Sequence, residues 1–290
     1  MTRRPAVAGT FYEADQANLL KSLEKCFLED FGPGRLPETR QERLGNVIGL
    51  VSPHAGYVYS GGAAAFAYSA LADDGLPDIV VILGPNHYGV GAPVALSLDT
   101  AWETPLGTLE LDKETAGEII RLCGFAQQDE APHLREHSIE VQLPFLQFIG
   151  GSRAKIVPIS IAHLPLRDAT QAATELGAAM ATALKGKSAV IIASTDLNHY
   201  ESRSRTAAQD SAAIEQILRL DPVGLIETVY HREISMCGAI GTAAMIEAAK
   251  TLGATKAHEL KHYTSGDVTG DIHQVVGYAA LSVTKGEGKF

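Results

Sequence analysis

The stretch "NVIGLVSPHAGYVYSGG" (residues 46–62) joins a short apolar run to a histidine and a segment rich in glycine and tyrosine. Residues 47–51 show no polar alternation, which is typical of a strand that is covered on both faces of a sheet. A turn after such a strand does not require a histidine. His54 is therefore either a hydrogen-bonded loop residue or part of a site, and this stretch alone leaves both interpretations open.

Short apolar runs of the same kind recur along the chain, and segments with helical periodicity lie between them. The further strand candidates are 79–83, 155–161, 189–193 and 275–283. The helix candidates are 15–29, 61–72, 112–123, 168–185, 205–219 and 239–252. Asp221 and Pro222 are typical of a helix cap that is followed by the first helical residue.

The alternation of these runs predicts an α/β fold. We expect one domain over residues 1–290, with a central, mostly parallel or mixed β-sheet and helices on both faces. Residues 31–43 combine glycine, proline and charge without periodicity, which predicts an exposed loop. The tail, residues 285–290, is expected to be frayed.

Composition excludes several classes of partner. The 290-residue chain carries a formal net charge of −10 and contains no run of Lys or Arg, so we expect neither nucleic acid nor an anionic membrane as a partner. Its three cysteines do not suggest a disulfide framework, which favours a reducing, cytoplasmic location. We also expect no signal peptide and no membrane span, because no apolar run approaches about 18 residues. The oligomeric state is left open.

Polar residues follow three of the predicted strands. His54 follows 47–51, His87 follows 79–83 in "GPNHYG", and 189–193 leads into "STDLNHY" with Asp196 and His199. In open α/β sheets the loops at the carboxyl ends of parallel strands converge on one crevice. These side chains can therefore lie together at the same edge of the sheet. The alternative is that each histidine is an ordinary hydrogen-bonded loop residue, which is common after a strand.

Cys237 is a fourth candidate because it stands just before the alanine-rich helix predicted at 239–252. A thiolate at a helix N-terminus is favoured by the helix dipole, and it is a soft metal ligand or a nucleophile. The alternative is a small buried apolar residue. Cys26 and Cys123 both fall in helical segments and are interpreted as core residues.

The segment "REHSIEVQLPFLQF" (135–148) offers Glu136, His137 and Glu140 ahead of an apolar helix. We interpret these three residues as a polar first helical turn, in which acidic side chains are favoured by the dipole.

Six motifs in order give the chain a resemblance to a known family. They are "AGTFYEAD" (8–15), "SPHAGYVYSG" (52–61), "LGPNHYG" (83–89), "EHSIEVQLPFL" (136–146), "STDLNHY" (194–200) and "CG" (237–238). Together they resemble the Memo family, the B component of the AmmeMemoRadiSam set. That family is structurally similar to class III extradiol dioxygenases, which hold non-haem iron with two histidines and a carboxylate.

The resemblance implies roles for particular residues. It makes His54 and His87 the two imidazole ligands of a metal, with Cys237 at the position of the carboxylate ligand in the dioxygenases. His199 matches their acid/base histidine, and Asp196 lies within reach as its partner or as an additional ligand. Family members are associated with iron and with copper, and zinc also suits two imidazoles and a thiolate.

The chain departs from animal relatives at two places. Asn198 stands where they tend to carry cysteine, and Ala239 and Ile240 stand where they carry an Arg-His pair after Cys-Gly. Recognition of phosphorylated receptor peptides, which is attributed to animal members, is therefore not transferred to this chain.

Three functions are compatible with these residues. The first is metal-dependent redox or dioxygenase-like activity on an unknown small molecule, although a thiolate in place of the carboxylate is itself oxidisable. The second is a non-enzymatic module that binds a peptide or a partner in the same crevice. The third is a zinc hydrolase with His199 as the base.

Overall fold

The computed structural model describes residues 2–99 and 101–286. In chain order its elements are β1 (Thr2–Arg3), α1 (Gln16–Leu28), β2 (Val47–Ser52), α2 (Tyr57–Asp74), β3 (Ile79–Pro85), β4 (Val94–Leu96), β5 (Ala101–Thr104), β6 (Gly107–Glu110), α3 (Lys113–Leu122), β7 (Ala126–Gln128), η1 (Ala131–His133), η2 (Glu140–Gln142), α4 (Leu143–Gly150), β8 (Lys155–Ile161), α5 (Leu166–Leu184), β9 (Ala189–Ser194), β10 (His199–Glu201), α6 (Arg203–Leu218), α7 (Pro222–His231), α8 (Ala239–Thr251), β11 (Lys256–Thr264), α9 (Ser265–Thr269) and β12 (Val275–Thr284).

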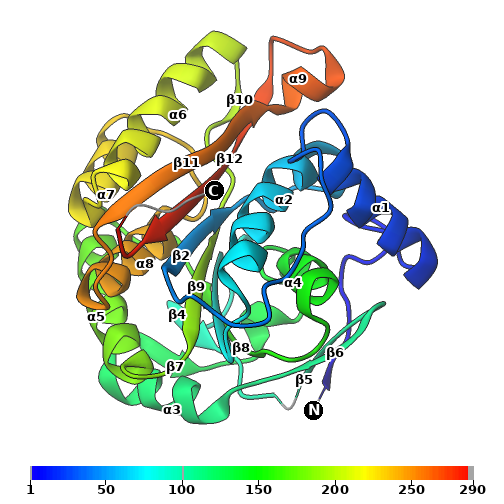
Figure 1. The fold of residues 1–290 in the computed structure, drawn as a ribbon. Coiled ribbons are helices and arrows are strands. Elements are labelled where there is room, and N and C mark those ends of the chain that lie inside the picture. Colours follow the sequence, from blue (N-terminus) through cyan, green and yellow to red (C-terminus); the bar gives the residue numbers. More distant parts are fainter. Residues whose placement is uncertain (1, 100, 287–290) are drawn as a thin grey trace.

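A mixed sheet occupies the centre of the molecule, as Figure 1 shows. Its strand order is β10-β12-β2-β9-β3-β8-β4-β7, and β11 pairs with β12. The four central strands β2, β9, β3 and β8 are parallel to one another, whereas β12 is antiparallel to β2. Strands β1, β5 and β6 form a separate small sheet. The carboxyl ends of the four parallel strands therefore lie at one edge.

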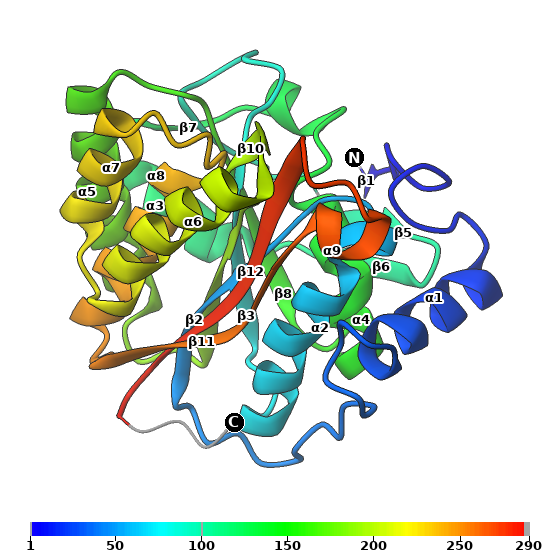
Figure 2. The same cartoon turned by 90° about the horizontal axis from the view of Figure 1, so that it is seen from above.

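Helices cover both faces of the large sheet, which Figure 2 shows from above. One face carries α3, α5, α6, α7 and α8, and the other carries α1, α2 and α4. Every residue of β2 and β3 is buried, as expected for strands between two helical layers. Gly49 of β2 allows close packing, since a Cβ at this position would collide with the side chain of Met245 in α8.

The predicted α/β class and the helices on both faces are confirmed. The five apolar runs became β2, β3, β8, β9 and β12, and the proposed cap at Asp221 begins α7, where its side chain accepts a hydrogen bond from the backbone of Gly224 at 2.9 Å. The sequence analysis missed β1, β4 to β7, β10 and β11. All of these strands except β11 have at most four residues, and β11 is only half-buried along most of its length. None of them carries an apolar run as long as those of the five predicted strands.

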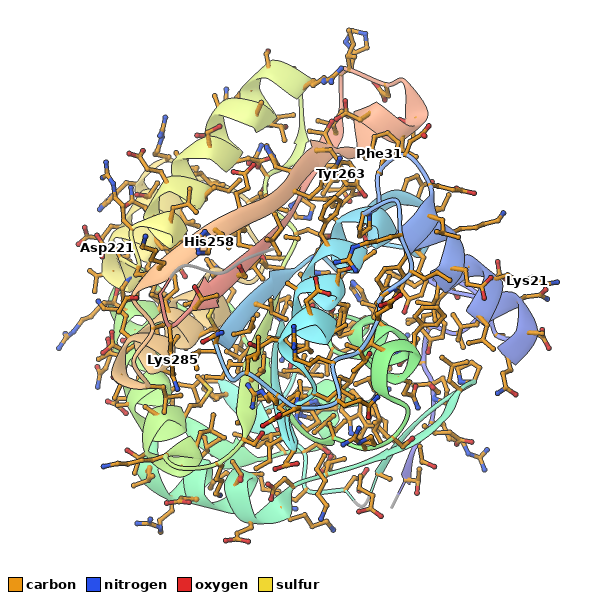
Figure 3. The ribbon with its side chains drawn as sticks, viewed as in Figure 1. Lys21, Phe31, Asp221, His258, Tyr263 and Lys285 are labelled. Atoms are coloured by element: carbon orange, nitrogen blue, oxygen red, sulfur yellow. The ribbon has the colours of Figure 1, made fainter. Side chains whose placement is uncertain are left out.

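The predicted exposed loop at 31–43 is a loop, but polar and aromatic contacts hold it to the molecule. The ring of Phe31 packs on that of Tyr263 with centroids 4.9 Å apart, and both side chains are labelled in Figure 3. Arg43 donates hydrogen bonds to the backbone carbonyls of Val47 and Ala189 at 3.1 and 2.9 Å. The loop therefore closes the amino-terminal edge of β2 and β9.

Part of the predicted frayed tail lies outside the described residues, which end at Gly286. The described part is hydrogen-bonded: the N–H of Lys285 donates to the carbonyl of Asn46 at 2.9 Å. Within 2–99 and 101–286, no helix is both long enough and apolar enough to cross a membrane.

Candidate functional site

The carboxyl ends of the parallel strands gather residues that are far apart in the sequence. His54 follows β2, His87 follows β3 and Asp196 follows β9. His137, from the segment between η1 and η2, reaches the same place. His54, His87 and His137 form the group that is called the candidate metal site below.

The three imidazoles of the candidate metal site face one another. One ring nitrogen from each lies within 4.8 Å of the other two. The rings of His87 and His137 stack with centroids 4.7 Å apart, and the ring of His54 meets each of them edge-on at 5.3 Å. This group could hold a metal ion, because neutral imidazole is a common ligand of zinc, copper and iron.

Hydrogen bonds assign the tautomer of His54, which is buried. The hydroxyl of Ser194 donates its proton to the carbonyl of Ser138 at 2.6 Å. Its oxygen therefore accepts from Nδ1 of His54 at 3.0 Å, and it also accepts from Nε2 of Gln142 at 2.8 Å. With the proton on Nδ1, Nε2 of His54 carries a lone pair that can bind a ligand.

A carboxylate orients His87 in the same way. Oε1 of Glu136 lies 2.9 Å from Nδ1 of His87, and Oε2 accepts from the backbone N–H of His87 at 2.8 Å. The same carboxylate accepts from the backbone N–H groups of His137 and Ser138, both at 2.9 Å. A carboxylate behind a ligating imidazole fixes the ring and raises its basicity, so Glu136 is a positioning residue that sequence reasoning assigned to a helix turn.

The N-terminal segment holds the loop that carries Glu136 and His137. The buried guanidinium of Arg3 donates to Oε2 of Glu140 at 2.7 Å, to the carbonyl of His133 at 2.6 Å and to that of Glu136 at 2.8 Å. Glu140 is fully buried, and its other oxygen accepts from the hydroxyl of Tyr12 at 2.7 Å. Its function in the structure is therefore to anchor the N-terminal segment.

The surroundings disfavour the charged forms of His54 and His137. Burial, together with the charges that His137 and His87 would carry, lowers the pKa of His54 well below 6.5. Burial also lowers the pKa of His137 to about 4, although Glu136 opposes the shift. Burial would raise the pKa of Glu136, but its hydrogen bond and charge interaction with His87 hold that pKa at about 2. The neutral rings of His54 and His137, together with the ionised carboxylate of Glu136, favour the binding of a cation.

Cys237 lies against His54, with Sγ 3.3 Å from Nε2 of the imidazole. The backbone N–H of Asp196 also points at Sγ, at 3.3 Å. The helix begins after Cys237, with Gly238 as its cap, but the expected stabilisation of a thiolate is outweighed. Burial and the charge of Asp196 raise the pKa of the Cys237 thiol to about 12.

Asp196 connects the two sides of the site. Its Oδ1 accepts from the backbone N–H of His54 at 2.8 Å, and its own backbone N–H is the one that points at Cys237. Burial raises the pKa of the Asp196 carboxyl above its ordinary value. These contacts place Asp196 as a residue that positions a histidine and a thiol.

His199 lies at the start of β10, at the edge of the sheet, and is not a member of the three-histidine group. Its Nδ1 lies 2.8 Å from the carbonyl of Ser235 and donates to it, while its backbone N–H donates to the Ser235 hydroxyl at 2.7 Å. Oδ1 of Asn198 accepts from the backbone N–H of Ser235 at 3.2 Å. Asn198 thus holds the segment that orients His199.

The sequence predicted five site residues, namely His54, His87, Cys237, Asp196 and His199. The structure groups the first two with His137, which the sequence analysis interpreted as part of a polar helical turn. The local sequence holds no signal that separates His137 from a polar residue at the start of a helix.

Comparisons with known proteins agree on one family. The family model described as "Memo-like protein" matches residues 3–282. A MEMO1 family protein of Methanopyrus kandleri is 48% identical over 288 residues, which cover 99% of this chain and all of the relative. A MEMO1 family protein of Methanothermobacter thermautotrophicus is 44% identical over 97% of this chain and all of the relative, and one of Thermotoga maritima is 44% identical over 96% and 98%.

Proposed function

The chain belongs to the Memo family, and from that premise we propose that its candidate metal site holds one transition-metal ion and supports redox chemistry on a small molecule. The observation that carries the proposal is the convergence of three imidazole nitrogens within 4.8 Å of one another. The contacts with Ser194 and Glu136 occupy Nδ1 of His54 and of His87, so Nε2 is the nitrogen that each ring can offer to a metal ion.

We include Cys237 as a further donor because of its contact with His54, although its sulfur is not among the ligand atoms that lie within 4.8 Å of one another. Two ligands of one tetrahedral ion, a sulfur at about 2.3 Å and a nitrogen at about 2.0 Å, stand about 3.5 Å apart. The separation of 3.3 Å between Sγ of Cys237 and Nε2 of His54 is close to that value. Imidazoles with a thiolate suit iron, copper or zinc. When bound, iron or copper would supply Lewis-acid and one-electron chemistry, and zinc would supply Lewis-acid chemistry alone.

The remaining polar residues have roles that follow from their contacts. Asp196 positions His54 and Cys237, and we propose that His199 moves protons at its Nε2, because its Nδ1 proton is committed to the carbonyl of Ser235. A reducing compartment such as the cytoplasm would keep Cys237 as a thiol.

Metal analysis tests this proposal. Anaerobically purified protein is expected to carry about one transition-metal ion per chain, and His54→Ala, His137→Ala and Cys237→Ser are each expected to lose most of it. His231→Ala is a matched control, because His231 is exposed at the end of α7. Only trace metal in protein expressed with iron and copper supplied would overturn the proposal. Zinc as the sole metal would favour hydrolysis, with His199 as the base.

One observation favours a non-enzymatic binding module as the second candidate. Large apolar side chains beside the site are exposed: Tyr88 is 51%, Leu134 is 62% and Tyr200 is 72% accessible. Exposed apolar side chains around a site can mark a protein or peptide interface. Oxygen consumption by the iron-loaded protein with a panel of catechols separates the two, since turnover supports the redox proposal and its absence favours binding alone.

A further inference from the structure

A cavity of about 470 Å³ adjoins the candidate metal site on the side of α7 and α8. The ends of β3 and β8 form one wall, and residues 229–241, from the end of α7 to the start of α8, form the other. His87 and Cys237 both line it. The cavity therefore leads to the edge of the site, and its volume lies in the range of about 300–1,000 Å³ that is usual for small-molecule pockets.

The body of the cavity is apolar. Its walls include the side chains of Leu83, Ile161, Val229, Ile234, Met236 and Ile240. None of the described residues that line it is Lys or Arg, and its one acidic residue, Glu233, is exposed. A carboxylate or phosphate buried there would have no cationic side chain to pair with, and an unpaired buried charge is strongly unfavourable.

Two polar side chains along the wall form hydrogen bonds within the protein. Nδ2 of Asn86 donates to the carbonyl of Val90 at 2.7 Å, and the hydroxyl of Tyr230 donates to the carbonyl of Leu164. The rings of Tyr230 and His163 stack with an interplanar angle of 8°, which gives the cavity a flat aromatic side. Among the lining residues, His87 and Cys237 lie at the end of the cavity that adjoins the candidate metal site.

We propose that this cavity binds the apolar body of an uncharged small molecule, about the size of one or two fused rings, and directs an oxygen donor at its end toward the candidate metal site. The cavity selects by excluding charge from the body of the ligand. The part of this inference that concerns the donor end rests on the proposed metal site, whereas the part that concerns the cavity does not.

Three hydroxamates on zinc-loaded protein test the proposal by calorimetry. Acetohydroxamate offers the donor end alone, 2-naphthohydroxamate adds an apolar body, and 6-carboxy-2-naphthohydroxamate adds a charge to that body. We expect the naphthyl compound to bind at least about tenfold more tightly than acetohydroxamate, because it buries more apolar area, and we expect the added carboxylate to remove that gain. Equal affinity of the naphthyl and acetyl compounds for zinc-loaded protein would overturn the proposal.

A variant with a filled cavity tests whether the naphthyl group binds there. Ala162 lines the cavity, so Ala162→Phe is expected to abolish the naphthyl gain and leave acetohydroxamate binding unchanged. Ala178→Phe, at an exposed position on α5, is the matched control and should retain the gain. A naphthyl gain that persists in folded Ala162→Phe protein would place the ligand elsewhere and contradict the assignment.

Measurements on metal-free protein separate this inference from the proposed function. Binding of 2-naphthol is expected to shift the methyl NMR signals of Ile234 and Met236, which line the cavity. If zinc does not bind but these signals shift, the metal proposal fails while the apolar cavity stands. If zinc binds but 2-naphthol leaves these signals unchanged, the cavity proposal fails alone.

Discussion

Ser194 determines which ring nitrogen of His54 is available to a ligand. Its hydroxyl proton goes to the carbonyl of Ser138, so its oxygen can only accept from Nδ1 of His54. Glu136 does the same for His87 with an ionised carboxylate. In both rings Nδ1 is engaged and Nε2 is left for a ligand. The partner of Nδ1 is a hydroxyl for His54 and a carboxylate for His87.

At this scale we expect Ser194→Ala to weaken metal binding by about 10–100-fold, the usual effect of removing the partner behind a ligating histidine. The measurement is a zinc titration against a chromophoric chelator. Ser52→Ala is the matched control: Ser52 pairs with Ser194 across β2 and β9, yet its hydroxyl has no hydrogen-bond partner among the described residues. An unchanged affinity in Ser194→Ala would show that the hydroxyl does not control the ring.

At the scale of elements, the N-terminal segment and the loop between η1 and η2 stabilise each other. The loop has only short 3₁₀ turns, η1 and η2, on either side of His137, so backbone hydrogen bonds alone do not hold it. Arg3 supplies three buried hydrogen bonds to this loop region and also packs over the ring of Trp102, 4.2 Å from its centroid. The placement of His137 therefore depends on residues that lie more than 100 positions earlier.

We expect Arg3→Ala to lower the free energy of unfolding by about 3–5 kcal/mol, because it leaves the carboxylate of Glu140 buried without its charged partner. Urea unfolding followed by circular dichroism measures the loss. Arg4→Ala, at the exposed neighbouring position, should change stability by less than about 0.5 kcal/mol. If the two variants unfold at the same urea concentration, the ion pair does not anchor the segment.

At the scale of the whole molecule, the parallel strands end at one edge, and the buried polar groups concentrate there. His54, Glu136, Ser138, Ser194 and Asp196 are all buried in this region. Buried polar groups are tolerated when each has its hydrogen-bond partners, and most of those partners come from distant elements. The site is therefore a property of the assembled sheet and its loops.

The buried histidines give the whole molecule a pH dependence. Burial holds the pKa of His133 at about 4 against an ordinary value of 6.5, and the pKa of His137 is also about 4. Between these values the unfolded chain binds protons that the folded protein does not, so the free energy of unfolding falls as the pH drops from 6.5 toward 4. Each such group contributes a slope of up to about 1.4 kcal/mol per pH unit.

Chemical unfolding at several pH values in this window, without added metal, measures the slope. His133→Gln removes one titrating group outside the candidate metal site and should make the slope smaller. His231→Gln, at an exposed position, should leave it as it is. A stability that does not change between pH 6.5 and 4 would contradict the shifts of both buried histidines.

The sequence by itself determined the α/β class, the five main strands and the location of His54, His87 and Asp196 at strand ends. The pattern of apolar residues is a local property of the sequence, and a strand that is buried on both faces is visible in it as an unbroken apolar run. It could not reveal β10 or β11, because β10 is a three-residue edge strand and β11 is half-exposed, with polar side chains along both of its faces.

Only the tertiary structure decided that His137 belongs with His54 and His87. Nothing in its local pattern distinguishes it from a polar residue at a helix start. Its position depends on the Arg3–Glu140 ion pair, which joins distant parts of the chain, and on the carboxylate of Glu136, which also contacts His87 of another loop. The protonation state of Cys237 also depends on the tertiary structure. Burial and the charge of Asp196 raise the pKa of its thiol, and this outweighs the lowering expected from the nearby helix N-terminus. Such long-range contacts have no counterpart in sequence spacing.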